Sequence, residues 1–375
     1  MACFKHSYRN ILSEGPAVRI GCLDSPTFLI ALDRVKKNNI YYIRSVMKAL
    51  VLGGSRFIGL HLVQELVRQG HEVTTFSRGH TPVLLPESVK RLYGDRSDKD
   101  QMRSIFSGTD FDLVFETSGN IVEDPYNPEA YKGEMQVWMD CFHGKIKRFI
   151  YCSTVGVYAR TGSGEITEDS PLNRDTGAGS YTRNNVQAED ILMAAYREHG
   201  FPVTMVRPTR VTGADNYRFG IEASYFTRLL QGRKVIIPGD GNNKFQGIDV
   251  DDLAELFVAS GTTSKGLGET YNAAGPDGIS INDYVAACGR ITGVTPEVVY
   301  LGADVMAQLE KPLATLPWQH SQAINMDKVK EHLNFVPKHG VVSALERAYA
   351  WYKTQDVGQM GFDFSYEKEI AERYG

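Results

Sequence analysis

The sequence lacks closely spaced cysteines and histidines. Its five cysteines lie far apart in the 375 residues, and the nine histidines show neither HxH nor HExxH spacing. Disulfide-rich domains and zinc sites depend on such short spacings, so we expect no disulfide framework and no metal site. Isolated cysteines are typical of reduced proteins, and we predict a cytoplasmic location.

An excess of basic residues and long hydrophobic runs are also missing. The 41 lysines and arginines are outnumbered by 45 acids, which gives a formal net charge of −4. Proteins that bind phosphate backbones usually carry a basic face, so nucleic acid is an unlikely partner. The longest apolar stretches are strand-sized and fall short of the roughly 20 residues of a membrane-spanning helix, so no membrane association is expected.

The first 46 residues differ from the rest. They show no clean hydrophobic period, and they precede a second methionine, Met47. Acids such as Glu14, Asp24 and Asp33 argue against a transit peptide, and no apolar core of a secretory signal is present. We predict that residues 1–46 are an extension of uncertain order that the fold does not need.

From Met47 onward, short apolar segments alternate with helical ones. Strands are expected at 48–54, 71–79, 89–95, 111–119, 147–154 and 202–208. This alternation predicts an α/β fold, a Rossmann-type doubly wound parallel sheet that binds ligands at the carboxyl ends of its strands. We assign 47–208 to a dinucleotide-binding Rossmann domain. Residues 209–375 are assigned to a smaller C-terminal substrate lobe, interleaved with the last elements of the sheet.

The segment VLGGSRFIG joins the first expected strand to the first expected helix. Glycines here allow a tight turn and let a diphosphate approach the amino end of the helix. A plain tight turn is the alternative, but the strand-loop-helix context favours a dinucleotide site. The predicted coenzyme contacts are Gly53, Gly54, Ser55, Arg56, Phe57, Ile58 and Gly59.

Two further positions indicate which dinucleotide is bound. Sites for NAD usually place a carboxylate at the end of the second strand, where this sequence has Ser77 and Arg78. Arg78 and Arg56 are able to form charge-assisted hydrogen bonds with a 2′-phosphate. We therefore predict NADP as the cofactor, with NAD as the alternative if both arginines are only solvated surface charges.

Five motifs, GGSRFIG, STVGVY, YTRNN, VRPTRVTG and DVDDLA, carry a family resemblance. In this order the sequence resembles the extended short-chain dehydrogenases/reductases, the NAD-dependent epimerase/dehydratase family, from about Met47 to the C-terminus. It is most similar to an atypical branch that includes chloroplast stem-loop RNA-binding proteins. The resemblance implies that Asp95 lies beside the adenine, with turn capping as the alternative, and that Pro208 lies near the nicotinamide. It also implies a homodimer.

The family uses a Ser/Thr, a Tyr and a Lys for catalysis. The matching positions are Thr154, Tyr181 and Asn185, so the lysine is missing. A cation about 4 Å from a phenolate contributes up to roughly 4 kcal/mol at an effective dielectric near 20. Without that charge, Tyr181 is expected to act as a proton donor near neutral pH. Asn185 is able to hydrogen-bond a ribose hydroxyl but supplies no charge.

The resemblance implies an NAD(P)-dependent oxidoreductase or epimerase that acts on a secondary alcohol or ketone of a sugar-like or nucleotide-sugar substrate. Val155 follows Thr154 where the family's dehydratases have an acid, which disfavours dehydration. Three alternatives stay open. Tyr181 acts as a general acid; another base such as Asp249 or Asp251 replaces it; or catalysis is reduced and the chain is an NADP-binding or RNA-associated protein.

Overall fold

The computed structural model describes residues 45–375, apart from several short segments. These are 82, 84, 119–127, 160–163, 176, 217–219, 312, 314, 315, 317–320, 322 and 357–359, together with the side chains of 128–134. The chain divides into two units, Met1–Val46 and Met47–Gly375. All but the last two residues of the predicted extension lie outside the described residues, and the elements below belong to the second unit.

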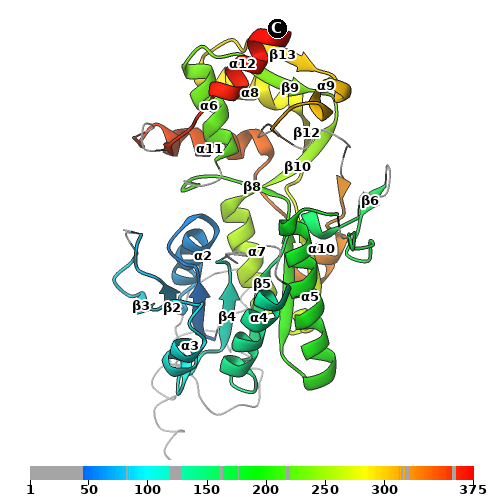
Figure 1. The fold of residues 1–375 in the computed structure, drawn as a ribbon. Coiled ribbons are helices and arrows are strands. Elements are labelled where there is room, and N and C mark those ends of the chain that lie inside the picture. Colours follow the sequence, from blue (N-terminus) through cyan, green and yellow to red (C-terminus); the bar gives the residue numbers. More distant parts are fainter. Residues whose placement is uncertain are drawn as a thin grey trace, which may run out of the picture. The chain divides into compact units, whose positions relative to one another are not determined.

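A seven-stranded parallel sheet forms the centre of this unit (Figure 1), in the order β11-β7-β5-β4-β1-β2-β3. The order reverses between β1 and β4, and such a switch point is where doubly wound sheets bind ligands. This confirms the predicted Rossmann-type fold. The strands are β1 (Lys48–Leu52), β2 (Glu72–Ser77), β3 (Lys90–Tyr93), β4 (Leu113–Glu116), β5 (Arg148–Cys152), β7 (Val203–Pro208) and β11 (Thr270–Ala273).

Helices cover both faces of the sheet, which explains why central strands such as β1 and β4 are almost entirely apolar and buried. Alternate residues of a strand point to opposite faces, and in β1 both sets are buried. Ala49 and Val51 pack in one core with residues of the two helices on the first face, whereas Leu50 and Leu52 pack in a second core with residues of three others. The first face carries α2 (Phe57–Arg68) and α7 (Val250–Thr262), and the second carries α3 (Lys99–Phe106), α4 (Pro128–Phe142) and α5 (Ser180–His199).

The C-terminal half contributes to the central sheet and also forms an apolar core of its own. Strand β11 and helix α7 join the central sheet, while a third apolar core forms around α6 (Ile221–Leu230), α8 (Ile281–Thr292) and α11 (Val341–Tyr352). The smaller sheets are β12-β10-β8, β13-β9 and β14-β6. Because α7 and β11 belong to the central layers, the boundary between 47–208 and 209–375 stays a prediction.

The remaining elements are short and connect these layers. They are η1 (Val155–Val157), β6 (Glu165–Ile166), β8 (Arg210–Thr212), β9 (Val235–Pro238), β10 (Lys244–Asp249), η2 (Ser264–Gly266), β12 (Gly278–Ser280), β13 (Val298–Leu301), α9 (Ala303–Ala307), β14 (Ala323–Ile324), α10 (Asp327–Leu333) and α12 (Ser365–Tyr374).

Candidate functional site

The loop between β1 and α2 has a backbone that only glycine can form. Gly53 adopts φ +88°, and a Cβ placed there would lie 2.6 Å from the Ser118 Cα. A Cβ on Gly54 would lie 2.7 Å from the Thr75 Cγ2, and one on Gly59 would overlap the Gly53 carbonyl oxygen. These contacts show why three glycines occur in this loop, and they leave its backbone open to close approach.

The residues between these glycines begin the helix. Arg56 is extended (φ −149°) and precedes α2 without any side-chain cap from the described residues, while Phe57 takes a left-handed φ of 38°. Ile58 packs against the core under the sheet. The first turn of α2 contains no acid. Its free amide groups therefore present partial positive charge suited to an anion.

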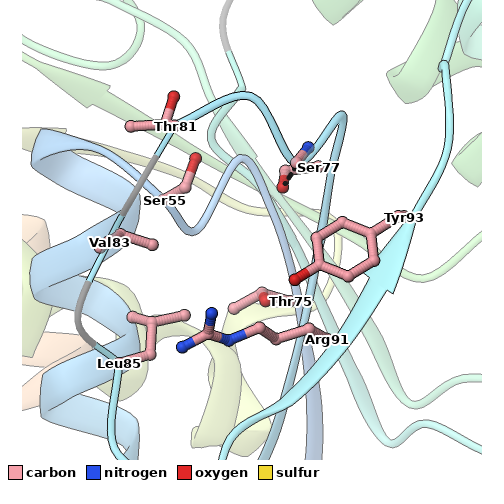
Figure 2. Close-up of a pocket in the computed structure, with 9 residues that line it drawn as sticks. Ser55, Thr75, Ser77, Thr81, Val83, Leu85, Arg91 and Tyr93 are labelled. Carbon is pink, nitrogen blue, oxygen red and sulfur yellow. Dashed lines mark hydrogen bonds between the residues drawn. The ribbon is translucent and has the colours of Figure 1, made fainter.

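A cavity of about 360 Å³ lies beside this loop (Figure 2). Ser55 of the loop and Ser77 at the end of β2 both line it, and their contact with a coenzyme stays a prediction. Its lining residues are Ser55, Thr75, Ser77, Gly79, Thr81, Val83, Leu85, Arg91 and Tyr93. Arg91 was not expected from the sequence, because only its position on β3 relative to β2 brings it to this cavity.

Neither of the two predicted arginines, Arg56 and Arg78, is among the lining residues of this cavity. The Arg56 Nε donates a hydrogen bond of 2.9 Å to the Thr81 Oγ1 at the cavity's edge. Arg78 is exposed and does not line the cavity. It acts instead on Asp95, whose pKa it helps to lower.

Asp95 makes a turn. Its Oδ1 accepts hydrogen bonds from the Ser97 backbone N–H at 2.9 Å and from the Ser97 hydroxyl at 2.7 Å. These bonds are the main reason that the pKa of Asp95 lies below its usual value, and nearby Arg78 and Arg96 lower it further. The capping alternative thus describes the contacts of Asp95, and a role beside the adenine stays a proposal.

Glu116 is a buried acid that the sequence interpretation missed. It ends β4 next to Ser118, whose backbone N–H donates to it at 2.8 Å and whose hydroxyl donates as well. Desolvation raises the pKa of Glu116, and Arg96, 3.8 Å away, opposes that shift. An acid closing the apolar run FDLVFE was the available signal, since ligands of a doubly wound sheet bind at this edge.

Thr154 and Tyr181 meet at the carboxyl edge of the sheet. Thr154 follows β5, and its Oγ1 accepts a hydrogen bond of 3.1 Å from the Gly156 N–H. A Cβ on Gly156 would lie 3.3 Å from that oxygen and 3.9 Å from the Tyr181 Cε1, so the hydroxyl and the phenol ring stand beside the same residue. Tyr181 stands in the first turn of α5, and 59% of its surface is exposed. Desolvation of the phenol nevertheless raises the pKa of Tyr181, and only the nearby Thr154 side chain acts against this shift. The phenol therefore stays protonated at neutral pH.

Asn185 occupies the lysine position and is bonded within the protein. Only 2% of its surface is exposed. Its Nδ2 donates to the Tyr181 carbonyl oxygen at 2.8 Å, and its Oδ1 accepts from the Tyr151 hydroxyl at 3.2 Å. No lysine or arginine of the described residues contributes to the pKa of Tyr181. The amide thus serves the packing of α5 on the sheet.

Arg207 of β7 is a buried cation next to α5, but it is already paired with an acid of that helix. The Arg207 guanidinium binds both carboxylate oxygens of Glu189, at 2.9 and 2.6 Å, and donates to the Tyr158 hydroxyl at 2.8 Å. Glu189 lies four residues after Asn185, on the same side of α5. This pair holds the end of β7, where Pro208 is the last residue, and supplies no free charge in place of the lysine.

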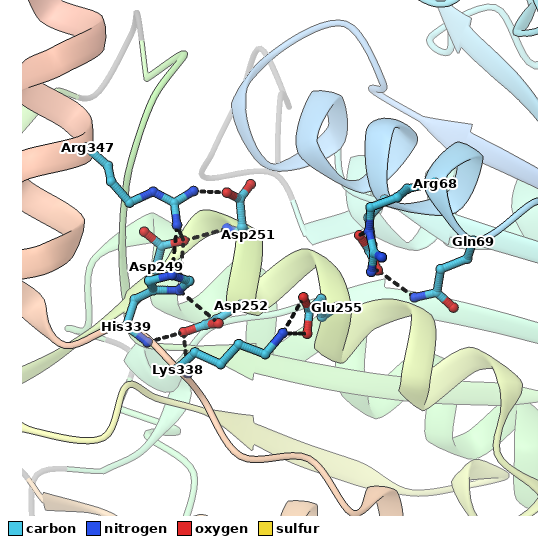
Figure 3. Close-up of polar contacts among 10 residues, drawn as sticks. Arg68, Gln69, Asp249, Asp251, Asp252, Glu255, Lys338, His339 and Arg347 are labelled. Atoms are coloured by element: carbon cyan, nitrogen blue, oxygen red, sulfur yellow. Dashed lines mark hydrogen bonds and ion pairs between the residues drawn. The ribbon is translucent and has the colours of Figure 1, made fainter. Parts of the chain in front are cut away.

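The alternative bases form an ionic cluster at the start of α7 (Figure 3). Asp249 is 1% exposed and caps α7 by accepting from the Asp251 N–H at 2.9 Å. Burial raises the pKa of Asp249, whereas Arg347 and His339 oppose the shift. Asp251 pairs with Arg347 and lies 2.5 Å from the His61 Nδ1. Both carboxylates are therefore engaged with partners, which disfavours them as catalytic bases.

Within the described part of the chain, no group of three or more metal-binding side chains lies close enough to hold an ion. A search of the same residues for a helix long and apolar enough to cross a bilayer also found none.

A doubly wound sheet with a glycine-only loop at its switch point defines a Rossmann-type, dinucleotide-binding class of protein. Within that class, the sequence model of the NAD dependent epimerase/dehydratase family matches residues 49–274. The chain belongs to this family, which confirms the resemblance inferred from the motifs.

Two curated relatives from Arabidopsis thaliana align over most of the chain. The chloroplast stem-loop binding protein of 41 kDa b is 28% identical over 81% of this chain and 79% of its own length. A putative UDP-arabinose 4-epimerase 2 is also 28% identical, over 84% of this chain and 81% of its own length. The relatives thus include proteins named as epimerases and one named as a stem-loop binding protein.

Solved structures share the fold. An epimerase of Methanothermobacter thermautotrophicus superposes with a TM-score of 0.70 at 18% identity, covering 82% of this chain and 93% of its own. A UDP-glucuronic acid 4-epimerase of Bacillus cereus, solved in complex with NAD, has a TM-score of 0.68 at 21% identity and covers 82% of this chain and 99% of its own. At these identities the similarity shows the fold alone.

Proposed function

We propose that this protein is an NADP-preferring oxidoreductase or epimerase that acts on a secondary alcohol or ketone of a sugar-like or nucleotide-sugar substrate. Membership of an NAD dependent family supports a nicotinamide coenzyme. Relatives named UDP-arabinose 4-epimerases support a sugar nucleotide. The proposal depends most on one observation, the position of the Thr154 hydroxyl and the Tyr181 phenol ring beside the same residue, Gly156.

The residues of the loop fit a dinucleotide. A side chain at Gly53 would collide with Ser118 and one at Gly59 with the Gly53 carbonyl oxygen, so only glycine allows the close packing of this loop, as in dinucleotide sites. The uncapped amino end of α2 favours a diphosphate there. A nicotinamide coenzyme, when bound, supplies or accepts the hydride.

The remaining steps belong to the chain's own side chains. In the direction of reduction, the Tyr181 phenol donates its proton to the substrate carbonyl oxygen, while the Thr154 hydroxyl hydrogen-bonds and orients that oxygen. Because no cation of the described residues acts on the phenol, proton donation is favoured over proton abstraction near neutral pH. We infer that reduction runs faster than alcohol oxidation under these conditions.

Replacing the phenol tests this proposal. Tyr181→Phe should lower NADP(H)-dependent turnover on a panel of ketones and nucleotide sugars by at least about 100-fold, in the range of general acid–base catalysis. Coenzyme affinity should stay unchanged. Tyr374→Phe is the matched control, since Tyr374 is an exposed tyrosine of the terminal helix. Turnover that survives in Tyr181→Phe would exclude Tyr181 as the proton donor.

A second candidate function is RNA binding, with catalysis reduced or lost. It is favoured by the 28% identity to a stem-loop binding protein and by the replacement of the lysine by Asn185. RNA titrations at several salt concentrations test it, because phosphate contacts give an affinity that falls steeply with salt. Steep dependence together with no turnover on the panel would favour the binding protein.

The proposal also includes a cytoplasmic location and a homodimer. Both come from the sequence, the first from its isolated cysteines and the second from the family resemblance. Light scattering of the purified full-length chain at micromolar concentration measures the oligomeric state directly, and a monomer there would remove the dimer from the proposal.

A further inference from the structure

The cavity beside the glycine loop lies between two neighbouring strands and the segment that follows β2. Thr75 pairs with Arg91 and Ser77 pairs with Tyr93 across β2 and β3. Since alternate residues of a strand share a face, all four side chains lie on the same face of the sheet. Figure 2 shows the Arg91 guanidinium extending across the cavity below Ser55.

The lining of this cavity is suited to an anion. Five hydroxyl groups and one guanidinium line it, with no carboxylate among the lining residues. Hydroxyl groups and guanidinium N–H groups are hydrogen-bond donors. Within the described part of the chain, Arg91 has no hydrogen bond or ion pair. Its charge is therefore available to a ligand.

The cavity reaches the coenzyme loop. Ser55 belongs to the glycine loop and Ser77 ends β2; in a dinucleotide site these two places flank the adenosine ribose. Arg91 stands two residues before Tyr93, the partner of Ser77, a distance of about 6.6 Å along the strand. A long arginine side chain is able to span that distance and meet a group that enters between Ser55 and Ser77.

Arg78 is less suited to this role. It is exposed, does not line the cavity, and lies close enough to Asp95 to lower the pKa of that carboxyl. Arg56 contributes differently, because its Nε already binds the Thr81 hydroxyl at the cavity's edge. Of the three arginines, Arg91 is the one that lines the cavity.

We propose that Arg91 is the residue that selects NADP over NAD, by binding the 2′-phosphate of the adenosine ribose within this cavity. This inference rests on the proposed coenzyme function and assigns its specificity to a residue of β3. A guanidinium binds phosphate through two parallel charge-assisted hydrogen bonds, and the surrounding hydroxyl groups supply further donors.

Calorimetric titration of the full-length chain with NADP⁺, NAD⁺ and 2′,5′-ADP tests the assignment. Arg91→Ala should weaken NADP⁺ and 2′,5′-ADP binding by about 10- to 100-fold, the usual effect of losing a charged hydrogen-bond partner. Binding of NAD⁺ should change by less than about twofold, which also shows that the variant is folded. Arg91→Lys, which keeps the charge but loses the paired geometry, should give an intermediate loss.

Arg78→Ala is the matched control, because it removes the same charge from a neighbouring exposed position. It should change NADP⁺ binding by less than about threefold, as expected for a screened charge. Equal losses in Arg78→Ala and Arg91→Ala, or an unchanged Arg91→Ala, would overturn the assignment while leaving coenzyme binding intact. If the unmodified protein binds neither coenzyme, the proposed function itself fails, and the assignment fails with it.

Discussion

The two ends of the expected coenzyme site are built differently. At the adenosine end, the loop is shaped by backbone geometry, and each of its three glycines is required by a neighbour such as Ser118 or Thr75. At the opposite end, the site depends on side chains, and Asn185 there is bonded to Tyr151 and to the backbone of Tyr181. The loop is thus restricted by its backbone, whereas the other end carries an amide, Asn185, where the family resemblance implies a lysine.

The largest expected effect tests whether the side-chain end is still able to hold a lysine. Asn185→Lys should lower the free energy of unfolding by about 3 kcal/mol, because it places an unpaired ammonium at a position that is only 2% exposed. Asn185→Met is the control for length without charge, and it should cost clearly less. Chemical denaturation of the two variants measures the difference.

A different result would change the comparison. If Asn185→Lys is as stable as Asn185→Met and raises turnover several-fold, the space for a lysine is still present. The asparagine would then be a simple loss in an otherwise intact family mechanism.

The second effect tests the backbone end. Gly53 and Gly70 both have positive φ, at +88° and +82°, but a Cβ on Gly70 would meet no atom within 4 Å. Gly70→Ala should therefore cost about 1 kcal/mol through backbone strain alone. Gly53→Ala should lower the free energy of unfolding by about 1 to 3 kcal/mol more than Gly70→Ala does, because the added methyl group overpacks against Ser118.

Coenzyme binding separates the same pair of variants. Gly53→Ala should weaken NADP⁺ binding by more than about tenfold, a loss of about 1.4 kcal/mol in binding free energy, because it displaces the loop. Gly70 lies outside the loop, so Gly70→Ala should leave the affinity unchanged. Equal affinities would show that the loop does not contact the coenzyme.

The smallest effect concerns pH. The pKa of Tyr181 is raised above its usual value, chiefly by desolvation, so the protonated phenol persists to higher pH than in free tyrosine. Reduction should change by less than about twofold between pH 6 and pH 9 and fall only above about pH 10. A pH–rate profile of the reduction step measures this. A decline that begins near pH 7 and is absent from Tyr181→Phe would show that the phenol is more acidic than the structure indicates.

Much of the fold could be predicted from short patterns. The six expected strands form at the expected places, and the helix after Gly54 begins at Phe57. The seventh strand, β11, was not predicted, because it comes from the C-terminal half and has only four residues, TYNA, of which Thr270 and Asn272 are polar. Its place next to β7 depends on the packing of the whole sheet.

The candidate site was predictable in its positions but not in its contacts. Thr154 and Tyr181 both lie beside Gly156. The sequence indicated that Asn185 is able to hydrogen-bond a ribose hydroxyl, but it did not indicate that the amide accepts from Tyr151, 34 residues earlier. Asp249 was considered as a base, but it lies 3.6 Å from the Arg347 guanidinium and 3.9 Å from the His339 ring, and both residues come about 90 or more positions later in the chain. Contacts over such separations leave no local pattern in a sequence.

By itself, the sequence determined the alternation of strands and helices, the glycine loop, and the places of Thr154 and Tyr181. These follow from the residue periods of strands and helices, which place alternate or every third to fourth side chain on one face, and from the backbone conformations that glycine allows. The tertiary structure decided that Arg91 rather than Arg78 faces the cavity, and that Asn185 is buried. Strand register and the course of the connecting segments determine which side chains meet, and both depend on residues distant in the chain.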